Sequence, residues 1–191
     1  MESGIELTRF TTKQGKVVIV TTLQESDFED LLRYANDLID EDTFVLLSGD
    51  HLTRKHEKKY VDDAIKAMKE KKKIHLIARI GGKLAASFEV RVLPLRKSHA
   101  GEIGISVAPE FRGSGVGKKC MEILIKEAKK LGLRLLVLMC FAINARAIHV
   151  YESFGFKKAG QIPGLLFYKG KYEDEILMYL NLASQGVALR S

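Results

Sequence analysis

A glycine-rich segment between an apolar, strand-like run and an amphipathic helix constrains this chain more than any other feature. Its glycines permit a tight turn and a close approach of the backbone to a ligand. The first amides of the following helix have no acceptor inside the helix, and the helix dipole favours an anion beside them. A cationic side chain stands at each end of the segment and would add full charges to a phosphate. The segment therefore predicts a phosphate-binding turn, and it reads Arg112-Gly113-Ser114-Gly115-Val116-Gly117-Lys118.

The spacing of this segment excludes two common phosphate loops. A Walker A loop requires glycine at position 112 and serine or threonine at position 119, where the chain has Arg112 and Lys119. The dinucleotide fingerprint requires the order G-x-G-x-x-G and a later acidic residue, whereas this chain has G-x-G-x-G without that acid. A glycine-rich turn without a ligand is the remaining alternative from this segment alone.

A second motif follows further along the chain. The run at 135–140 is apolar, as expected of a buried strand. Asn144, Ala147 and Tyr151 come after it, followed by Gly155 and Phe156. Because Asn144 and Tyr151 are seven residues apart, or two helical turns, we expect both on one face of a short helix.

Together, R-x-x-G-x-G at 112–117 and N-x-x-A-x-x-x-Y-x-x-x-G-F at 144–156 resemble the two cofactor motifs of the GNAT superfamily of N-acetyltransferases. The resemblance covers residues 17 to 182. It implies an α+β (mixed α/β) fold, with a mostly antiparallel central sheet flanked by helices. The fourth and fifth strands of that sheet would splay apart around acetyl-CoA. The implied acetyl-CoA contacts are Ile105, Ser106, Val107, Arg112, Gly113, Ser114, Gly115, Val116, Gly117, Lys118, Asn144, Ala147 and Tyr151.

The resemblance also implies a reaction, the direct attack of a primary amine on the acetyl-CoA thioester. Tyr151 would act as general acid toward the departing thiolate, which suits a phenol because the two groups have comparable basicity. Glu102, at the start of the fourth strand, is the candidate general base, and a water chain is the alternative. Read without the family, Tyr151 would be an ordinary core aromatic and Glu102 an ordinary surface carboxylate.

The acceptor is expected to be a small amine or an amino acid. The closing stretch at 170–178 resembles the end of family members that act on such molecules. Ribosomal-protein alanine N-acetyltransferases carry a glutamate in the fifth strand, where this chain has Met139. An acidic group could attract a cationic amine on the acceptor side: Asp37, Asp40, Glu41 and Asp42. Acetylation of protein N-termini or lysines, and acyl-CoA binding without turnover, are the alternatives.

Composition agrees with one domain over residues 1–191, with a core at 17–182 and a frayed tail at 183–191. The 191 residues are 46% hydrophobic, which is enough to bury a sizeable core. No run approaches a transmembrane span, and the N-terminus lacks signal-peptide features, so the sequence predicts a cytoplasmic protein. The net charge of +7 falls largely on two helical segments without a recognition motif, so no nucleic-acid partner is expected.

Cysteine and histidine usage predicts neither a disulfide nor a metal site. Cys120 and Cys140 lie within apolar patterns and are expected to be buried thiols. The five histidines are scattered without ligand spacing. A homodimer is compatible with the resemblance, although no motif specifies one.

Periodicity and turn residues predict the remaining elements. Gln14-Gly15 and Gly81-Gly82 are typical of hairpin turns. Ser26 is expected to cap the first helix and Thr53 the second. The predicted strands are 5–10, 16–21, 74–80, 84–92, 103–107, 135–140, a short one near 156 and 175–182, with a connector at 163–164 before the last.

Overall fold

The computed structural model describes residues 1–182, and their contacts divide the chain into two compact units. The first unit consists of Met1–Arg91 and Gly104–Ala128. The second consists of Val92–Ile103 and the described part of Lys129–Ser191. The predicted tail at 183–191 lies outside the described residues, and the single domain stays a prediction.

The first unit is built on an antiparallel meander. Its strands pair in the order β1-β2-β3-β4, and the second half of β5 lies next to β4. The glycines at both predicted hairpin turns have positive φ angles, for example 77° at Gly15, which confirms the two turns. The strands are β1 (Glu6–Thr11), β2 (Val17–Thr22), β3 (Lys73–Ile80), β4 (Lys83–Val92) and β5 (Ala100–Val107).

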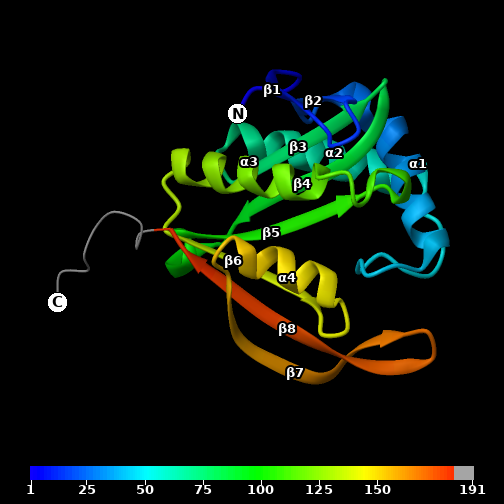
Figure 1. Ribbon diagram of the computed structural model, residues 1–191. Helices are drawn as coiled ribbons and strands as arrows, with labels where there is room; N and C mark the ends of the chain where they lie inside the picture. Colours follow the sequence, from blue (N-terminus) through cyan, green and yellow to red (C-terminus); the bar gives the residue numbers. More distant parts are fainter. Residues whose placement is uncertain (183–191) are drawn as a thin grey trace. The chain divides into compact units, whose positions relative to one another are not determined.

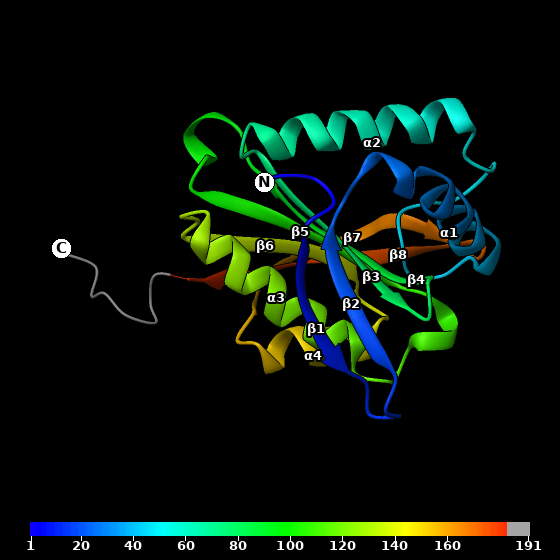
Figure 2. The ribbon, with the colours of Figure 1, turned by 90° about the horizontal axis from the view of Figure 1, so that it is seen from above.

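Three helices accompany this meander: α1 (Phe28–Glu41), α2 (Arg54–Lys69) and α3 (Val116–Lys130), which begins in this unit. Figure 2 shows α2 and α3 on opposite sides of the strands, so β3 is covered from both faces. Seven of the eight β3 residues are buried. This double cover explains why β3 reads as a continuous apolar run rather than as an alternating one.

The two helix starts differ in how well the sequence predicted them. Thr53 caps α2 as expected, since its hydroxyl accepts a hydrogen bond from the His56 amide at 3.3 Å. Ser26 does not cap α1, and that prediction was wrong. It lies inside a short 3-10 turn, Glu25–Asp27, whose cap is Gln24. The Asp27 carboxylate accepts a hydrogen bond from the Gln24 amide at 2.9 Å and so takes the role expected of a serine.

The second unit contains the first half of β5, then β6 (Leu135–Phe141), α4 (Ala145–Ser153), β7 (Lys157–Tyr168) and β8 (Lys171–Asn181). These strands pair in the order β5-β6-β8-β7. The β5–β6 pair is parallel, with a register from Ala100–Leu135 to Glu102–Val137, and the other pairs are antiparallel. Figure 1 shows β7 and β8 as one long hairpin.

This hairpin is longer than predicted. The expected connector at Pro163-Gly164 lies within β7, where the register shifts between Ile162 and Leu166. A proline is tolerated there because β7 ends the strand order and the local bulge removes the need for a ladder amide. The Gly164 amide donates to the Asp174 side chain at 2.9 Å and holds the bulge against β8.

The architecture is the predicted mixed α/β type, with mostly antiparallel strands and flanking helices. Across residues 1–182, no helix has the length and apolar character needed to cross a membrane.

Candidate functional site

The predicted phosphate turn joins β5 to α3 in the first unit. Two of its glycines have left-handed backbone conformations, with φ of 80° at Gly113 and 93° at Gly115. Side-chain-bearing residues adopt such angles only at a cost, so glycine is required at both positions. The Lys119 amide donates to the Gly115 carbonyl at 3.1 Å as α3 begins. Helix geometry therefore leaves the preceding amides, those of Val116 and Gly117, without an acceptor inside the helix.

Gly117 serves a different purpose from the turn glycines. A Cβ atom at this position would lie 3.3 Å from Val107 Cγ2. That distance is tighter than ordinary packing, so glycine lets the start of α3 approach the end of β5 closely. The turn thus has the geometry of an anion cradle at a helix N-terminus.

Ser114 is occupied by contacts within the protein. Its side chain is buried, and the hydroxyl donates to the Phe111 carbonyl at 2.5 Å. Its own carbonyl accepts from the Lys13 amide at 3.1 Å. Ser114 therefore shapes the turn, and any cofactor contact by this residue would fall to its backbone amide.

Arg112 makes a contact that the sequence did not predict. Its Nη2 lies 2.7 Å from Glu41 Oε2, and Nη1 contacts the other oxygen of the same carboxylate. Its Nε donates to the Val107 carbonyl at 2.9 Å. The hydrogen bonds and charge of Glu41 raise the pKa of Arg112. The guanidinium expected to meet a pyrophosphate is thus held between the last residue of α1 and the end of β5.

The β5 segment assigned to the cofactor continues this polar arrangement. Ile105, Ser106 and Val107 are half-buried. The Tyr34 hydroxyl of α1 donates to Ser106 Oγ at 2.9 Å, and Ser106 Oγ donates to the Ser87 carbonyl at 3.4 Å. Burial raises the pKa of Tyr34, so its phenol stays protonated.

Tyr151 lies in the second unit, near the end of α4. Its ring is half-buried, with its centroid 6.1 Å from that of Phe156. Burial, and then the charge of Cys140, raise the pKa of Tyr151 to about 12. The phenol is therefore protonated at neutral pH, as a general acid must be before it acts.

Asn144 stands one residue before α4 and caps it, rather than lying on the helix face with Tyr151 as predicted. Its side-chain oxygen accepts from the Ala147 amide at 3.1 Å, with φ −83° and ψ 63° at the cap. An asparagine favours this position because its short amide satisfies an amide of the first turn. The predicted pantetheine contact of Asn144 stays a prediction.

Glu102 has an acidic neighbour that the sequence analysis did not single out. The carboxylate of Glu175 on β8 is buried, and burial followed by the charge of Glu102 raises its pKa. In the strand register, Glu102 pairs with Val137 and Val137 pairs with Tyr179. Glu175 is four residues from Tyr179, so both carboxylates belong to one face of these strands. Only the register could reveal this, since the two glutamates are far apart in sequence.

The two cysteines are free and buried, as predicted. Burial, and then the charge of Glu175, raise the pKa of Cys140 to about 11, and burial raises that of Cys120. Both are thiols at neutral pH and poor nucleophiles. Within residues 1–182, no group of three or more possible ligands is arranged to hold a metal ion.

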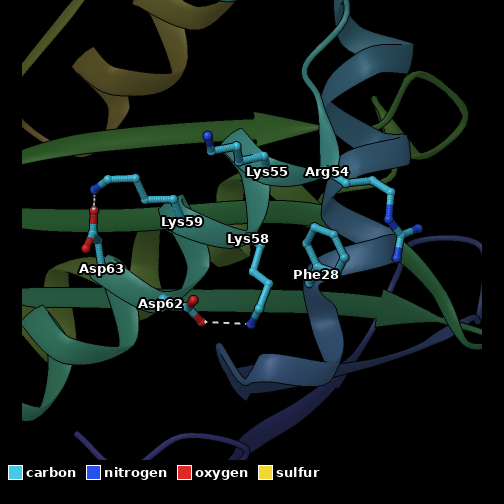
Figure 3. Close-up of a pocket in the computed structure, with 7 residues that line it drawn as sticks. All are labelled: Phe28, Arg54, Lys55, Lys58, Lys59, Asp62 and Asp63. Atoms are coloured by element: carbon cyan, nitrogen blue, oxygen red, sulfur yellow. Dashed lines mark hydrogen bonds and ion pairs between the residues drawn. The ribbon is translucent and has the colours of Figure 1, made fainter.

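A hollow beside α1 and α2 contains none of the predicted site residues (Figure 3). Two lysines that line it form ion pairs with aspartates of the same helix, α2: Lys58 Nζ lies 3.4 Å from Asp62 Oδ1, and Lys59 pairs with Asp63. The lining residues are Phe28, Arg54, Lys55, Lys58, Lys59, Asp62 and Asp63.

Solved structures define the class of protein to which this fold belongs. A GNAT-family acetyltransferase from Streptococcus pneumoniae superposes with a TM-score of 0.78 and 24% identity, covering 86% of this chain and 98% of the other. A putative acetyltransferase from Salmonella typhimurium, solved with its cofactor acetyl-CoA, gives a TM-score of 0.76 and 18% identity over 91% and 98% of the two chains. The fold is therefore that of the acetyltransferases.

Sequence comparison then identifies the family. The model of the acetyltransferase (GNAT) family matches residues 35–156, which is more than half of the chain, so the chain belongs to this family. The resemblance inferred from the two motifs is confirmed, and so is the fold class.

Curated relatives carry two kinds of substrate in their names. The L-amino acid N-acyltransferase MnaT of Escherichia coli (strain K12) is 31% identical over 84 residues, 44% of this chain and 49% of that protein. The [Ribosomal protein bS18]-alanine N-acetyltransferase of the same strain is 35% identical over 102 residues, 53% of this chain and 67% of that protein. The chain thus spans about half the length of MnaT and two thirds of the ribosomal-protein enzyme.

Proposed function

We propose that this protein is an N-acetyltransferase that transfers the acetyl group of acetyl-CoA to a primary amine. The observation that carries the proposal is the glycine turn at the start of α3, with its left-handed Gly113 and Gly115 and its two first-turn amides. Membership of the GNAT family supplies the reaction class for this turn. The acetyl-CoA bound to the Salmonella typhimurium neighbour supports the same cosubstrate.

The chemistry requires an acid and a base. The amine nitrogen would attack the thioester carbonyl carbon in a ternary complex, and the carbon–sulfur bond would break. Tyr151 would give its phenolic proton to the CoA thiolate, and its raised pKa means that this proton is present at neutral pH. Glu102 or a water chain would take the proton from the amine. A backbone amide of Ile105, Ser106 or Val107 would stabilise the developing oxyanion.

For the acceptor, we favour a small amine or an amino acid. MnaT is named for L-amino acids, and other relatives are named for L-methionine sulfoximine and L-methionine sulfone. A protein N-terminus is the second candidate, favoured by the name of the ribosomal-protein alanine enzyme, and lysine acetylation is a further form of it. An acyl-CoA-binding domain without turnover is the third. A cytoplasmic location and a homodimer stay predictions.

The experiment is to incubate the purified protein with acetyl-CoA and a panel of amines while following free thiol. The panel should contain L-amino acids, L-methionine sulfoximine, polyamines, aminoglycosides, and peptides with an N-terminal alanine or an internal lysine. Thiol release with one class would identify both the reaction and the acceptor. Tight acetyl-CoA binding by calorimetry without thiol release would favour the binding domain instead.

A further inference from the structure

The turn of the β1–β2 hairpin lies against the glycine turn that precedes α3. The Lys13 amide donates to the Ser114 carbonyl at 3.1 Å. A Cβ atom at Gly115 would lie 3.8 Å from Lys13 Cγ, which is an ordinary packing distance. Both segments belong to the first unit. The aliphatic stem of the Lys13 side chain therefore passes beside Gly115, at the edge of the proposed anion cradle.

Hydrogen bonds within the hairpin turn fix the backbone at Lys13. The Thr12 amide donates to the Lys16 carbonyl at 2.9 Å, and the Gly15 amide donates to the Thr12 carbonyl at 3.0 Å. The hydroxyl of Thr12, a buried residue, accepts from the Lys16 amide at 3.1 Å. Because the backbone is held before any ligand arrives, little entropy remains to be lost there on binding.

The ammonium of Lys13 is a cation without a partner in the described chain. Lys13 is exposed, and among residues 1–182 no ion pair and no hydrogen bond engages its side chain. Two other cations near the turn are already engaged. Arg112 is held by Glu41, and Lys119 Nζ lies 2.6 Å from Glu122 Oε2. Lys13 can therefore offer its full charge to an anion without giving up another contact.

Lys13 lies outside both cofactor motifs and before residues 35–156, the range that the family model matches. Its contact with the glycine turn comes only from the folding of the hairpin onto that turn. A phosphate held by the first amides of α3, those of Val116 and Gly117, would lie next to Gly115. A lysine whose stem passes beside Gly115 suits such a ligand, because its ammonium is a compact charge on a flexible stem.

We propose that Lys13 binds the pyrophosphate of acetyl-CoA from the hairpin side of the glycine turn. This inference rests on the proposed function, because it takes the glycine turn as the place of the cosubstrate. The amides of Val116 and Gly117 would donate to phosphate oxygens, and Lys13 Nζ would add a charge-assisted hydrogen bond. The β1–β2 hairpin would thus be a part of the cosubstrate site that lies outside the family's motifs.

The test measures the affinity of Lys13→Met for three ligands by calorimetry. The ligands are CoA, dephospho-CoA, which lacks the 3′-phosphate, and pantetheine, which lacks the pyrophosphate as well. We expect CoA and dephospho-CoA to bind about fivefold more weakly, the upper value for an exposed ion pair. Pantetheine should bind as it does to the unchanged protein. The difference for CoA should shrink at high salt, because screening weakens an exposed charge contact.

Two variants control for charge and for packing. Lys71→Met removes the same charge from an exposed lysine that precedes β3, whereas the residues after the hairpin turn pair with the end of β3, as Val18 does with Ile80. This variant should bind all three ligands normally. Lys13→Arg keeps the charge and should restore most of the affinity that Lys13→Met loses. An equal loss in Lys71→Met would overturn the proposal, since net charge alone would then explain the effect.

The ligand series separates the remaining outcomes. Full affinity of Lys13→Met for dephospho-CoA would overturn the proposal, and a loss confined to CoA would assign Lys13 to the 3′-phosphate instead. An equal loss for pantetheine would make Lys13 a structural support of the turn and would also overturn it. A wild-type protein that binds neither CoA nor acetyl-CoA would reject the proposed function and this inference together. An active wild type with an equally tight Lys13→Met would reject Lys13 alone.

Discussion

Replacing Glu41 with glutamine would test whether Arg112 is a ligand for the CoA pyrophosphate. In the structure the guanidinium is engaged by Glu41 through two contacts, and a pyrophosphate would have to compete with that carboxylate. The two side chains are 29% and 30% exposed. Exposed ion pairs contribute roughly 0.2–1 kcal/mol, and a bidentate, half-buried pair belongs near the upper end of that range. Without Glu41, CoA binding no longer has to break an ion pair worth about 1 kcal/mol. The dissociation constant of CoA should therefore fall roughly fivefold, since about 1.4 kcal/mol is tenfold.

The assay is calorimetric titration with CoA at low and high salt. The gain from Glu41→Gln should shrink at high salt, because screening weakens both the ion pair and the phosphate contact. Pantetheine, which lacks the pyrophosphate, should bind both proteins equally. Glu122→Gln is the matched control, since Glu122 pairs with Lys119 at 2.6 Å on the exposed side of α3. Unchanged or weaker CoA binding by Glu41→Gln would refute the idea that Arg112 leaves Glu41 to bind the pyrophosphate. Glu41 would then serve only to hold Arg112 in its position beside the turn.

Two further predictions address Tyr151 and His75. Tyr151→Phe should bind acetyl-CoA normally but transfer acetyl about 100-fold more slowly in single-turnover measurements, and full activity would remove the general-acid role. His75 is neutral in the folded state down to a pKa of about 4, whereas the unfolded chain takes up its proton below about 6.5. Because the unfolded state binds more protons in this window, the free energy of unfolding should fall by about 3 kcal/mol as the pH drops from 6.5 to 4. Denaturant unfolding at several pH values should show this slope, and His75→Gln should flatten it; an equal slope in both proteins would contradict the assignment to His75.

Local sequence signals predicted most elements because the physics behind them is local. The apolar runs of β3 and β6, the glycines at the two hairpin turns and the Thr53 cap each act over a few residues. The errors also have local causes. Ser26 was expected to cap the helix because serine is among the strongest capping residues, yet here Gln24 is the cap and Asp27 completes it. Pro163 was read as a break, although an edge strand with a bulge accommodates a proline.

The candidate site also contains features that short sequence patterns predicted and contacts that they did not. The glycine turn and the motif around Tyr151 were recognised as short patterns, and they led to the family without any tertiary information. The pairing of Arg112 with Glu41 spans 71 residues, and that of Tyr34 with Ser106 spans 72. No spacing rule predicts such contacts, because they depend on which helix packs over which strand.

By itself the sequence therefore determined the fold class, the family and the position of the glycine turn, since each follows from residue types at short, regular spacing. Only the tertiary structure decided which charges meet: Glu41 with Arg112, Glu102 with Glu175, and Lys73, Tyr60 and His75 around Glu89. The physical reason is that electrostatic and hydrogen-bonding energies depend on distance and burial. Both quantities are defined only once distant segments pack together.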